Sequence, residues 1–216
     1  MTPNAAAKRG SKLFVGSLVY PIEVNFPLLK RMSLEDFYDF CEENRDLRIE
    51  RTKERNVIIL PPVYTETGSK NFYLTGQLGI WTRQDKMGIG FDSSTGFTLP
   101  NGATRSPDVS WIRLERWNAL PKEKRKKFAK IAPDFVIELR SETDRLKDLQ
   151  KKMREYIENG VQLGWLIDPE NKRVHIYRPK TETKVFGKPE RSFRRAFTQR
   201  LCAEFAGNLG LKGKRK

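Results

Sequence analysis

The sequence predicts the α/β class, with a mixed β-sheet flanked by helices. Short runs of β-branched residues alternate with longer segments of helical periodicity. Their order is strand, strand, helix, strands, helix, strand, helix, strand, strand. The 216 residues, 38% of them hydrophobic, are enough to bury the core of one domain, and no internal repeat is visible.

The first predicted helix covers residues 33–44. Apolar residues recur at helical spacing from Leu34 to Cys41, and Ser33 is a good N-cap with Asp36 three residues on, in place of the usual glutamate of a capping box. Periodicity and boundary residues predict three more helices, at 67–86, at 121–130 with a proline in its first turn, and at 143–159 before a glycine.

The predicted strands are short and are either apolar or alternating. In chain order they cover 47–51, 57–60, 89–92, 96–99, 107–112, 135–139, 164–168 and 173–177. The first two form a predicted strand pair. The last two are joined by residues 169–172, which predict a hairpin-type turn.

These elements predict a domain over residues 32–180, with an N-terminal arm over 1–31 and a basic C-terminal tail over 181–216. The chain has a net charge of +15, and residues 178–216 contribute +9 of it through 12 Lys/Arg and 3 Asp/Glu. Such a tail either binds phosphate groups through counterion release or is a solvated, disordered end. Charge alone leaves both alternatives open.

The composition excludes several kinds of functional site. Cys41 and Cys202 lie far apart, so no disulfide framework or CxxC zinc pair is present, and His175 cannot build a His-rich metal site alone. We expect Cys41 in the core and His175 as a packing or surface residue. Because no run of about 18 apolar residues occurs, we expect a cytoplasmic protein that does not span a membrane.

Two carboxylates occupy unusual positions. Asp108 opens a predicted strand, and Glu138 lies inside the apolar run 135–139. Strand alternation allows Glu138 to be an edge or surface residue paired with Arg140. Alternatively, Asp108 and Glu138 lie on neighbouring strands and converge on a divalent cation, because Mg²⁺ prefers hard oxygen ligands and keeps several waters. Spacing alone leaves both alternatives open.

The helix over 143–159 offers a cation that could orient an attacking water. Lys151 lies nearly opposite the apolar stripe of this helix, whereas Lys152 and Gln150 flank the stripe. A lysine in that position can lay its stem along the core and bring its ammonium to the end of the sheet. Helical geometry therefore favours Lys152 over Lys151. The alternative is that Lys152 is only a snorkelling lysine at the edge of the core.

Several segments together form a recognisable set of motifs. They are Phe91-Asp-Ser-Ser-Thr-Gly-Phe-Thr-Leu-Pro-Asn-Gly102, Ser106-Pro-Asp-Val-Ser-Trp111, Pro133-Asp-Phe-Val-Ile-Glu-Leu-Arg-Ser141, Lys151-Lys-Met-Arg-Glu-Tyr-Ile-Glu-Asn-Gly160 and Gly164-Trp-Leu-Ile-Asp-Pro169. Over residues 26–178 the chain resembles the bacterial putative restriction endonuclease family, often called Uma-two, of the PD-(D/E)xK nuclease superfamily. The resemblance implies a restriction-endonuclease-like fold and a metal-dependent phosphodiesterase core.

The resemblance also implies residue roles. Asp108 and Glu138 match the two acidic positions that hold Mg²⁺ or Mn²⁺, and Lys152 matches the lysine that the family places on the following helix. The plain superfamily pattern has its lysine two residues after the glutamate, where this chain has Arg140. Because arginine keeps its proton, Arg140 suits phosphate contact better than proton transfer.

Two further residues are candidates beside that site. Glu50 matches a recurrent acidic position of the family and is expected as an additional carboxylate. Gln150 is a candidate for phosphate contact, as is Arg140.

The chain departs from the family after about residue 185. The family usually continues with an apolar, Leu-Pro-containing segment, whereas this chain has the basic segment 191–200 and ends in Lys212-Gly-Lys-Arg-Lys216. We hypothesise that the tail is read out of frame from about Arg195. Nucleotide sequencing would test this, and an out-of-frame tail would say nothing about DNA binding.

Together these observations predict a metal-dependent endonuclease whose partner is nucleic acid, with DNA the expected substrate. A homodimer could cut both strands of a duplex, although nothing in the sequence requires one. Two alternatives stay open: a non-catalytic nucleic-acid-binding module, in which Trp81, Trp111 and Trp117 stack on bases, and a protein-interaction scaffold. We expect these tryptophans to be core residues, because their neighbours are apolar.

Overall fold

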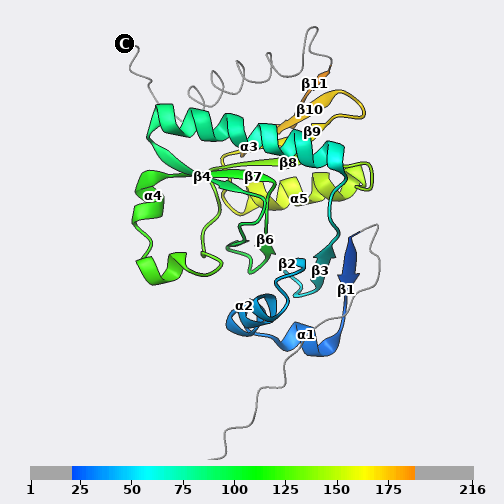
Figure 1. Ribbon diagram of the computed structural model, residues 1–216, viewed down its shortest axis with the longest axis vertical. Coiled ribbons are helices and arrows are strands. Elements are labelled where there is room, and N and C mark those ends of the chain that lie inside the picture. The colour runs from blue at the N-terminus through cyan, green and yellow to red at the C-terminus, as the bar shows by residue number, and fades with distance from the viewer. Residues whose placement is uncertain (1–20, 188–216) are drawn as a thin grey trace, which may run out of the picture.

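The computed structural model describes residues 21–187, which form two β-sheets with helices packed against them (Figure 1). In chain order the elements are β1 (Ile22–Val24), α1 (Pro27–Arg31), α2 (Leu34–Glu43), β2 (Arg48–Arg51), β3 (Val57–Leu60), α3 (Thr65–Asp85), β4 (Gly88–Asp92), β5 (Phe97–Thr98), β6 (Thr104–Arg105), β7 (Val109–Arg113), α4 (Leu114–Asn118), the 3₁₀ turn η1 (Lys122–Arg125), β8 (Phe135–Leu139), α5 (Leu146–Glu158), β9 (Leu163–Asp168), β10 (Arg173–Tyr177) and β11 (Lys184–Gly187). The α/β class is confirmed, but the strands divide between two sheets where the sequence predicted one.

The larger sheet has the strand order β11-β10-β9-β8-β7-β4. Its strands pair antiparallel except for β8 and β9, which run parallel and are joined by α5. Parallel neighbours need such a crossover, and a helix is its usual form. Figure 1 shows α3 across one side of this sheet and α5 on the other, so the centre of the sheet is covered on both faces.

Strand β8 lies in the middle of this sandwich, and all five of its residues are buried. Phe135 and Ile137 pack into the cluster that contains Leu78 of α3, whereas Val136 packs into the cluster that contains Met153 of α5. Because side chains alternate along a strand, Glu138 faces the same side as Val136, toward α5. The alternation of β8 therefore buries a carboxylate beneath a helix.

The smaller sheet has the order β1-β3-β2-β6-β5. Helix α2 packs against it, with Phe37 and Phe40 of the helix in one apolar cluster with Ile49 of β2. The predicted pairing of β2 and β3 is confirmed, with Ile49 opposite Ile59. Because Ile49 faces α2, its neighbours on either side along β2 face the opposite way. This face of β2 meets α5, where Glu50 of β2 accepts a hydrogen bond from Lys152 of α5.

The N-terminus of α2 is held as the sequence predicts. The Ser33 hydroxyl accepts a hydrogen bond from the Asp36 amide at 3.1 Å, and the Asp36 carboxylate accepts one from the Ser33 amide at 2.9 Å. An aspartate therefore replaces the glutamate of a capping box without loss of either hydrogen bond.

The predicted helix over 121–130 is wrong, since only the 3₁₀ turn Lys122–Arg125 forms there. The segment is rich in like charges at helical spacing, which destabilise a helix, and it has no apolar stripe. Its end is also held by tertiary contacts. Phe128 packs edge-on against Tyr38 at 5.5 Å between ring centroids, and Ala129 forms a bridge to Phe97.

The folded part reaches beyond the boundaries expected at residues 32 and 180. Ile22–Val24 pairs antiparallel with β3, and Lys184–Gly187 pairs antiparallel with β10. Residues 1–20 and 188–216 lie outside the described residues. The rest of the expected arm and tail, the out-of-frame hypothesis and Cys202 therefore lie there as well.

The residues expected in the core are largely there. Trp81 and Trp111 are buried and pack edge-on at 5.5 Å, and Trp117 packs partly buried against Phe91. His175 is buried on β10. Trp81 and Trp111 therefore belong to the core and do not form a base-stacking surface, whereas Trp117 lies at the edge of the core. Within residues 21–187, no helix has both the length and the apolarity that crossing a bilayer requires.

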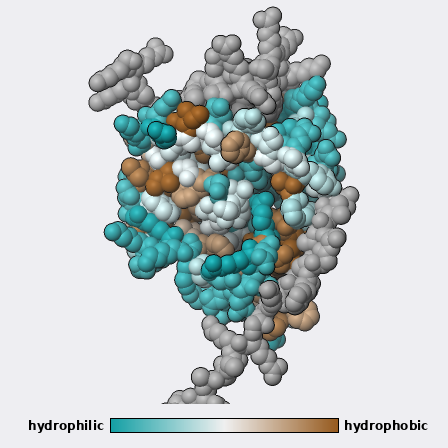
Figure 2. Space-filling model, in the orientation of Figure 1, coloured by the Kyte–Doolittle hydropathy of each residue, from teal (hydrophilic) through white to brown (hydrophobic). Residues whose placement is uncertain are grey.

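The surface seen in Figure 2 is mainly hydrophilic, with separate apolar patches between polar residues. Some of the exposed apolar side chains come from α3, namely Phe72, Tyr73 and Ile80. A protein-interaction scaffold would be expected to carry one contiguous apolar surface. The face shown in Figure 2 does not carry one.

We expect Gly88→Ala to destabilise the fold by about 1–3 kcal/mol, because a methyl group there would overpack the core. A Cβ at Gly88 would lie 2.1 Å from the Trp111 ring and 2.5 Å from the Ile112 carbonyl oxygen, so the backbone would have to move. Gly90→Ala on the same strand is the control, since its Cβ would come no closer than 3.5 Å to any neighbour. Equal unfolding midpoints in urea for the two variants would contradict this packing.

Candidate active site

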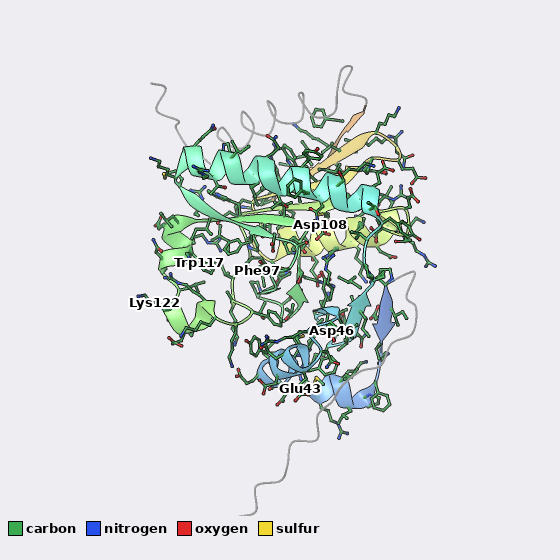
Figure 3. The ribbon with its side chains drawn as sticks, in the orientation of Figure 1. Glu43, Asp46, Phe97, Asp108, Trp117 and Lys122 are labelled. Atoms are coloured by element: carbon green, nitrogen blue, oxygen red, sulfur yellow. The ribbon has the colours of Figure 1, made fainter. Side chains whose placement is uncertain are left out.

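The two predicted carboxylates face each other across the junction of β7 and β8. In this antiparallel pair Val109 stands opposite Ile137, so Asp108, which precedes β7, stands opposite Glu138. Oδ2 of Asp108 accepts a hydrogen bond from the Leu139 amide at 2.8 Å, which fixes the aspartate at the end of β8. Figure 3 shows Asp108 beside α5. The structure thus brings together the two acids that the sequence singled out.

Lys152 of α5 completes this group. Its ammonium donates to Oε1 of Glu50 at 2.8 Å and lies 2.9 Å from Oε1 of Glu138. The side chain of Lys152 is 15% exposed, whereas Lys151 is exposed to solvent. The face of α5 that the sequence favoured is the one that reaches the carboxylates, so Lys152 is more than a snorkelling lysine.

Glu50 of β2 anchors this ammonium from the smaller sheet. Besides Lys152, it accepts hydrogen bonds from the Arg105 guanidinium at 3.1 Å and the Ser106 amide at 3.0 Å. Burial acts to raise the pKa of Glu50, but the charges of Lys152 and Arg105 and these hydrogen bonds outweigh burial and lower it to about 2. Arg105 is held in turn by Glu155 of α5, Nε to Oε2 at 2.7 Å.

Glu138 has the opposite electrostatic balance. Burial raises its pKa to about 7, and the nearby charges of Asp108 and Glu50 add to this rise, while Lys152 only partly offsets it. The Tyr156 hydroxyl donates to Oε1 of Glu138 at 2.9 Å. Burial thus brings the pKa of Glu138 close to neutrality, so the charge of this carboxylate is sensitive to its surroundings.

Asp108 also has a raised pKa. Burial is the main cause, and it outweighs the Leu139 hydrogen bond and the positive charges of Lys152 and Arg48. The Arg48 guanidinium, at the start of β2, lies 3.9 Å from Oδ1 of Asp108. Burial therefore works against the charged form of both facing acids, although a lysine stands beside them.

Each of the two acids keeps one carboxylate oxygen available. Among residues 21–187, Oδ1 of Asp108 and Oε2 of Glu138 accept no hydrogen bond. Four acidic side chains, those of Glu50, Asp108, Glu138 and Glu155, share their surroundings with three cations, the closely paired Lys152 and Arg105 and the more distant Arg48. This surplus of negative charge would favour a bound cation.

These groups open into a pocket of about 80 Å³, a volume that holds an ion with several waters. Its lining includes Arg48, Asp108, Glu138 and Lys152. Further walls come from the β3–α3 loop, from the start of α3 and from the segment between β8 and α5, with Pro61, Pro62, Val63, Thr67, Asn71, Ser141, Thr143 and Asp144. Within the described part of the chain, no three His, Cys, Asp or Glu side chains converge on one point. A metal here would thus rest on two carboxylates.

Two predicted residues lie apart from this group. Arg140 is paired with Asp168 at 3.2 Å and with Glu170 at 2.7 Å, so neither a contact with Glu138 nor one with a phosphate in the pocket is its role here. Gln150 does not line the pocket. Glu138 is buried and is not paired with Arg140, so the alternative in which these two residues form a pair at the surface is wrong.

The sequence analysis missed three residues of this site. Arg48 alternates with Glu50 on β2, Arg105 directly precedes the Ser106-Pro-Asp motif, and Tyr156 lies one helical turn after Lys152. Each of these positions in the sequence could have suggested a site residue, but none of the three spacings is specific for a functional site. Only the meeting of the two sheets with α5 shows that these side chains share one network.

We expect Glu50→Gln to lower the free energy of unfolding by about 3–5 kcal/mol at neutral pH, because Lys152 and Arg105 would lose a buried charged partner. The folded pKa of Glu50, about 2, lies below its usual value of 4.5, so its stabilisation is present in full above about pH 4.5. That stabilisation is lost as the pH falls toward 2. Urea denaturation of both proteins should show their difference shrinking over this range, and a constant difference would contradict the assignment.

Comparisons with known proteins show a matching family and a similar fold. The model of the Uma2 family, described as "Putative restriction endonuclease", matches residues 34–203. No curated protein is significantly similar to the chain. Among solved structures, the crystal structure of a putative nuclease from Anabaena variabilis matches with a TM-score of 0.57 and 23% sequence identity, and the match covers 72% of this chain and 89% of that one. At this identity the likeness concerns the fold alone.

Proposed function

Because this chain belongs to the Uma2 family, described as "Putative restriction endonuclease", we propose that it is a metal-dependent endonuclease that hydrolyses phosphodiester bonds of nucleic acid. One observation carries the proposal: Asp108, Glu138 and Lys152 come from three separate elements and line one pocket. Two hard oxygen donors can hold a divalent cation beside a phosphate, and a protonated amine next to them can stabilise negative charge that develops in the transition state.

The donor set fits Mg²⁺ or Mn²⁺. These ions prefer oxygen ligands, and Mg²⁺ keeps several waters, so Asp108 and Glu138 together with a substrate phosphate suffice to hold one. The available oxygens and the surplus of negative charge favour cation binding, and because the pKa values of Glu138 and Asp108 are raised, a proton competes with the metal for these carboxylates. A bound Mg²⁺ would lower the pKa of a coordinated water and offset charge on the scissile phosphate.

Lys152 acts in this proposal as a fixed positive charge. Burial acts to lower its pKa, but Glu138 and Glu50 outweigh burial and raise it, so the amine stays protonated at neutral pH. An ammonium has three N–H groups, and two of them reach Glu50 and Glu138. The third can orient the attacking water or stabilise negative charge that develops on the phosphate.

The substrate that we propose is DNA. Apart from the basic tail, residues 1–177 carry +6 of the net charge of +15, which favours a polyanion, and binding through phosphates would be salt-dependent. A homodimer would bring two such sites to one duplex, which double-strand cleavage requires unless the enzyme acts twice. Glu50 and Arg105 serve as positioning residues in this scheme, since they act on the site through Lys152.

A non-catalytic nucleic-acid-binding module is the second candidate function. The same net charge of +15 supports it. The buried indoles of Trp81 and Trp111 speak against base stacking as its mode of binding. Titration with metal separates the two functions, because a binding module would retain DNA without a metal requirement and without strand scission.

We expect Asp108→Ala, Glu138→Ala and Lys152→Ala each to abolish metal-dependent cleavage, with a loss of at least about 100-fold, as for other electrostatic groups that stabilise a transition state. Cleavage of supercoiled plasmid with Mg²⁺, with Mn²⁺ and with chelator measures this loss. The matched control is Lys151→Ala, on the same helix but exposed, which should cleave like the wild type. Circular dichroism checks that every variant is folded, and undiminished cleavage by the three site variants would refute the assignment.

Metal binding should also be visible without substrate. At a free concentration ten times its Kd, Mg²⁺ or Mn²⁺ should stabilise the wild type by about 1.4 kcal/mol, because it binds only the folded chain. A thermal melt measures this gain as a rise in Tm that chelator reverses. Asp108→Ala should show little of the rise. An equal rise in Lys151→Ala and Asp108→Ala would place the metal elsewhere.

A further inference from the structure

We propose that Arg48 binds a substrate phosphate at the mouth of this pocket. The inference rests on the proposed function and extends it with a residue that neither the motifs nor the predicted candidates include. Arg48 lies at the start of β2, lines the pocket together with Asp108, Glu138 and Lys152, and belongs to the sheet opposite the two acids.

The other two cations of the site, Lys152 and Arg105, are already paired with carboxylates. Lys152 is bound by Glu50 and Glu138, and Arg105 is bound by Glu50 and Glu155, with side chains 15% and 10% exposed. Two carboxylates therefore hold each of them in place. Neither can leave its two carboxylates for a phosphate without leaving a buried acid unpaired, which is costly.

Arg48 differs from them in each respect. Its side chain is 35% exposed, and its nearest carboxylate oxygen is Oδ1 of Asp108 at 3.9 Å, beyond hydrogen-bond distance. Its Nε is buried and has no hydrogen-bond partner. Among residues 21–187, Arg48 is thus the pocket-lining cation whose side chain makes no hydrogen bond.

The backbone of β2 directs this side chain to the pocket. Ile49 packs toward α2, so Arg48 and Glu50 share the face that meets α5. Arg48 lines the pocket, whereas Glu50 is buried against Lys152. The same strand thus supplies both the acid that holds Lys152 and the arginine that remains available.

The guanidinium of Arg48 can bind the two non-bridging oxygens of one phosphate group. Guanidinium is planar and presents parallel N–H groups that match a phosphate in a bidentate contact. Thr67, Asn71 and Thr143 line the same pocket and can donate to the same anion, as hydroxyls and amides commonly do at nucleic-acid backbones. Because Arg48 lies beside Asp108, a phosphate held there would lie next to the two carboxylates.

Equilibrium binding of the full chain to a short fluorescent DNA duplex, in EDTA and over a range of salt, tests this role. We expect Arg48→Ala to bind about tenfold more weakly and to reduce the slope of log K against log salt by about 0.9, as for one lost phosphate contact. Arg48→Lys should keep the slope with intermediate affinity, because it keeps the charge but not the planar fork. The control Arg45→Ala removes an exposed arginine paired only with exposed Glu42 and should bind like the wild type.

The outcomes separate this inference from the proposed function. If the wild type cleaves DNA and Arg48→Ala keeps both affinity and slope, Arg48 does not bind phosphate, and the nuclease proposal stands. If Arg48→Ala loses affinity but the wild type shows no metal-dependent cleavage, the nuclease proposal fails while Arg48 remains a phosphate-binding residue. If Arg48→Ala instead loses the metal-induced rise in Tm with unchanged DNA binding, Arg48 only supports Asp108 and the inference is overturned.

Discussion

The ammonium of Lys152 joins two carboxylates that belong to different sheets, and the arrangement of the site depends on this contact. Glu138 comes from the centre of the larger sheet, Glu50 from the smaller sheet, and the lysine from the helix between them. Each partner is buried, so each is costly without the others. The two sheets and α5 are consequently held in one relative position by charge as well as by apolar packing.

The two glutamates respond differently to the same lysine. Glu50 accepts three hydrogen bonds and its pKa is lowered to about 2, so it stays ionised at neutral pH and fixes Lys152. Glu138 faces other acids, and burial raises its pKa to about 7, so its charge depends on what occupies the pocket. One carboxylate therefore fixes the lysine, whereas the charge of the other depends on its surroundings.

Helix α5 contributes to this division through three successive positions on one face. Lys152, Glu155 and Tyr156 reach Glu50, Arg105 and Glu138 respectively. Spacings of three and four residues place such side chains together on a helix. The crossover that makes β8 and β9 parallel thus also delivers the groups that hold the acids of the site.

The sequence by itself determined the α/β class, the capped start of α2, most of the strands and the choice of Lys152 over Lys151, because these follow from local periodicity and from the family resemblance. Only the tertiary structure decided the division into two sheets, the loss of the helix after Pro121, the burial of Glu138 and the diversion of Arg140 to Asp168. Which charges meet depends on strand order and helix placement, and a side chain's neighbours in space are not encoded at any fixed spacing along the chain. The network of Glu50 with Arg105 and Lys152, and the position of Arg48 beside Asp108, belong to this second group.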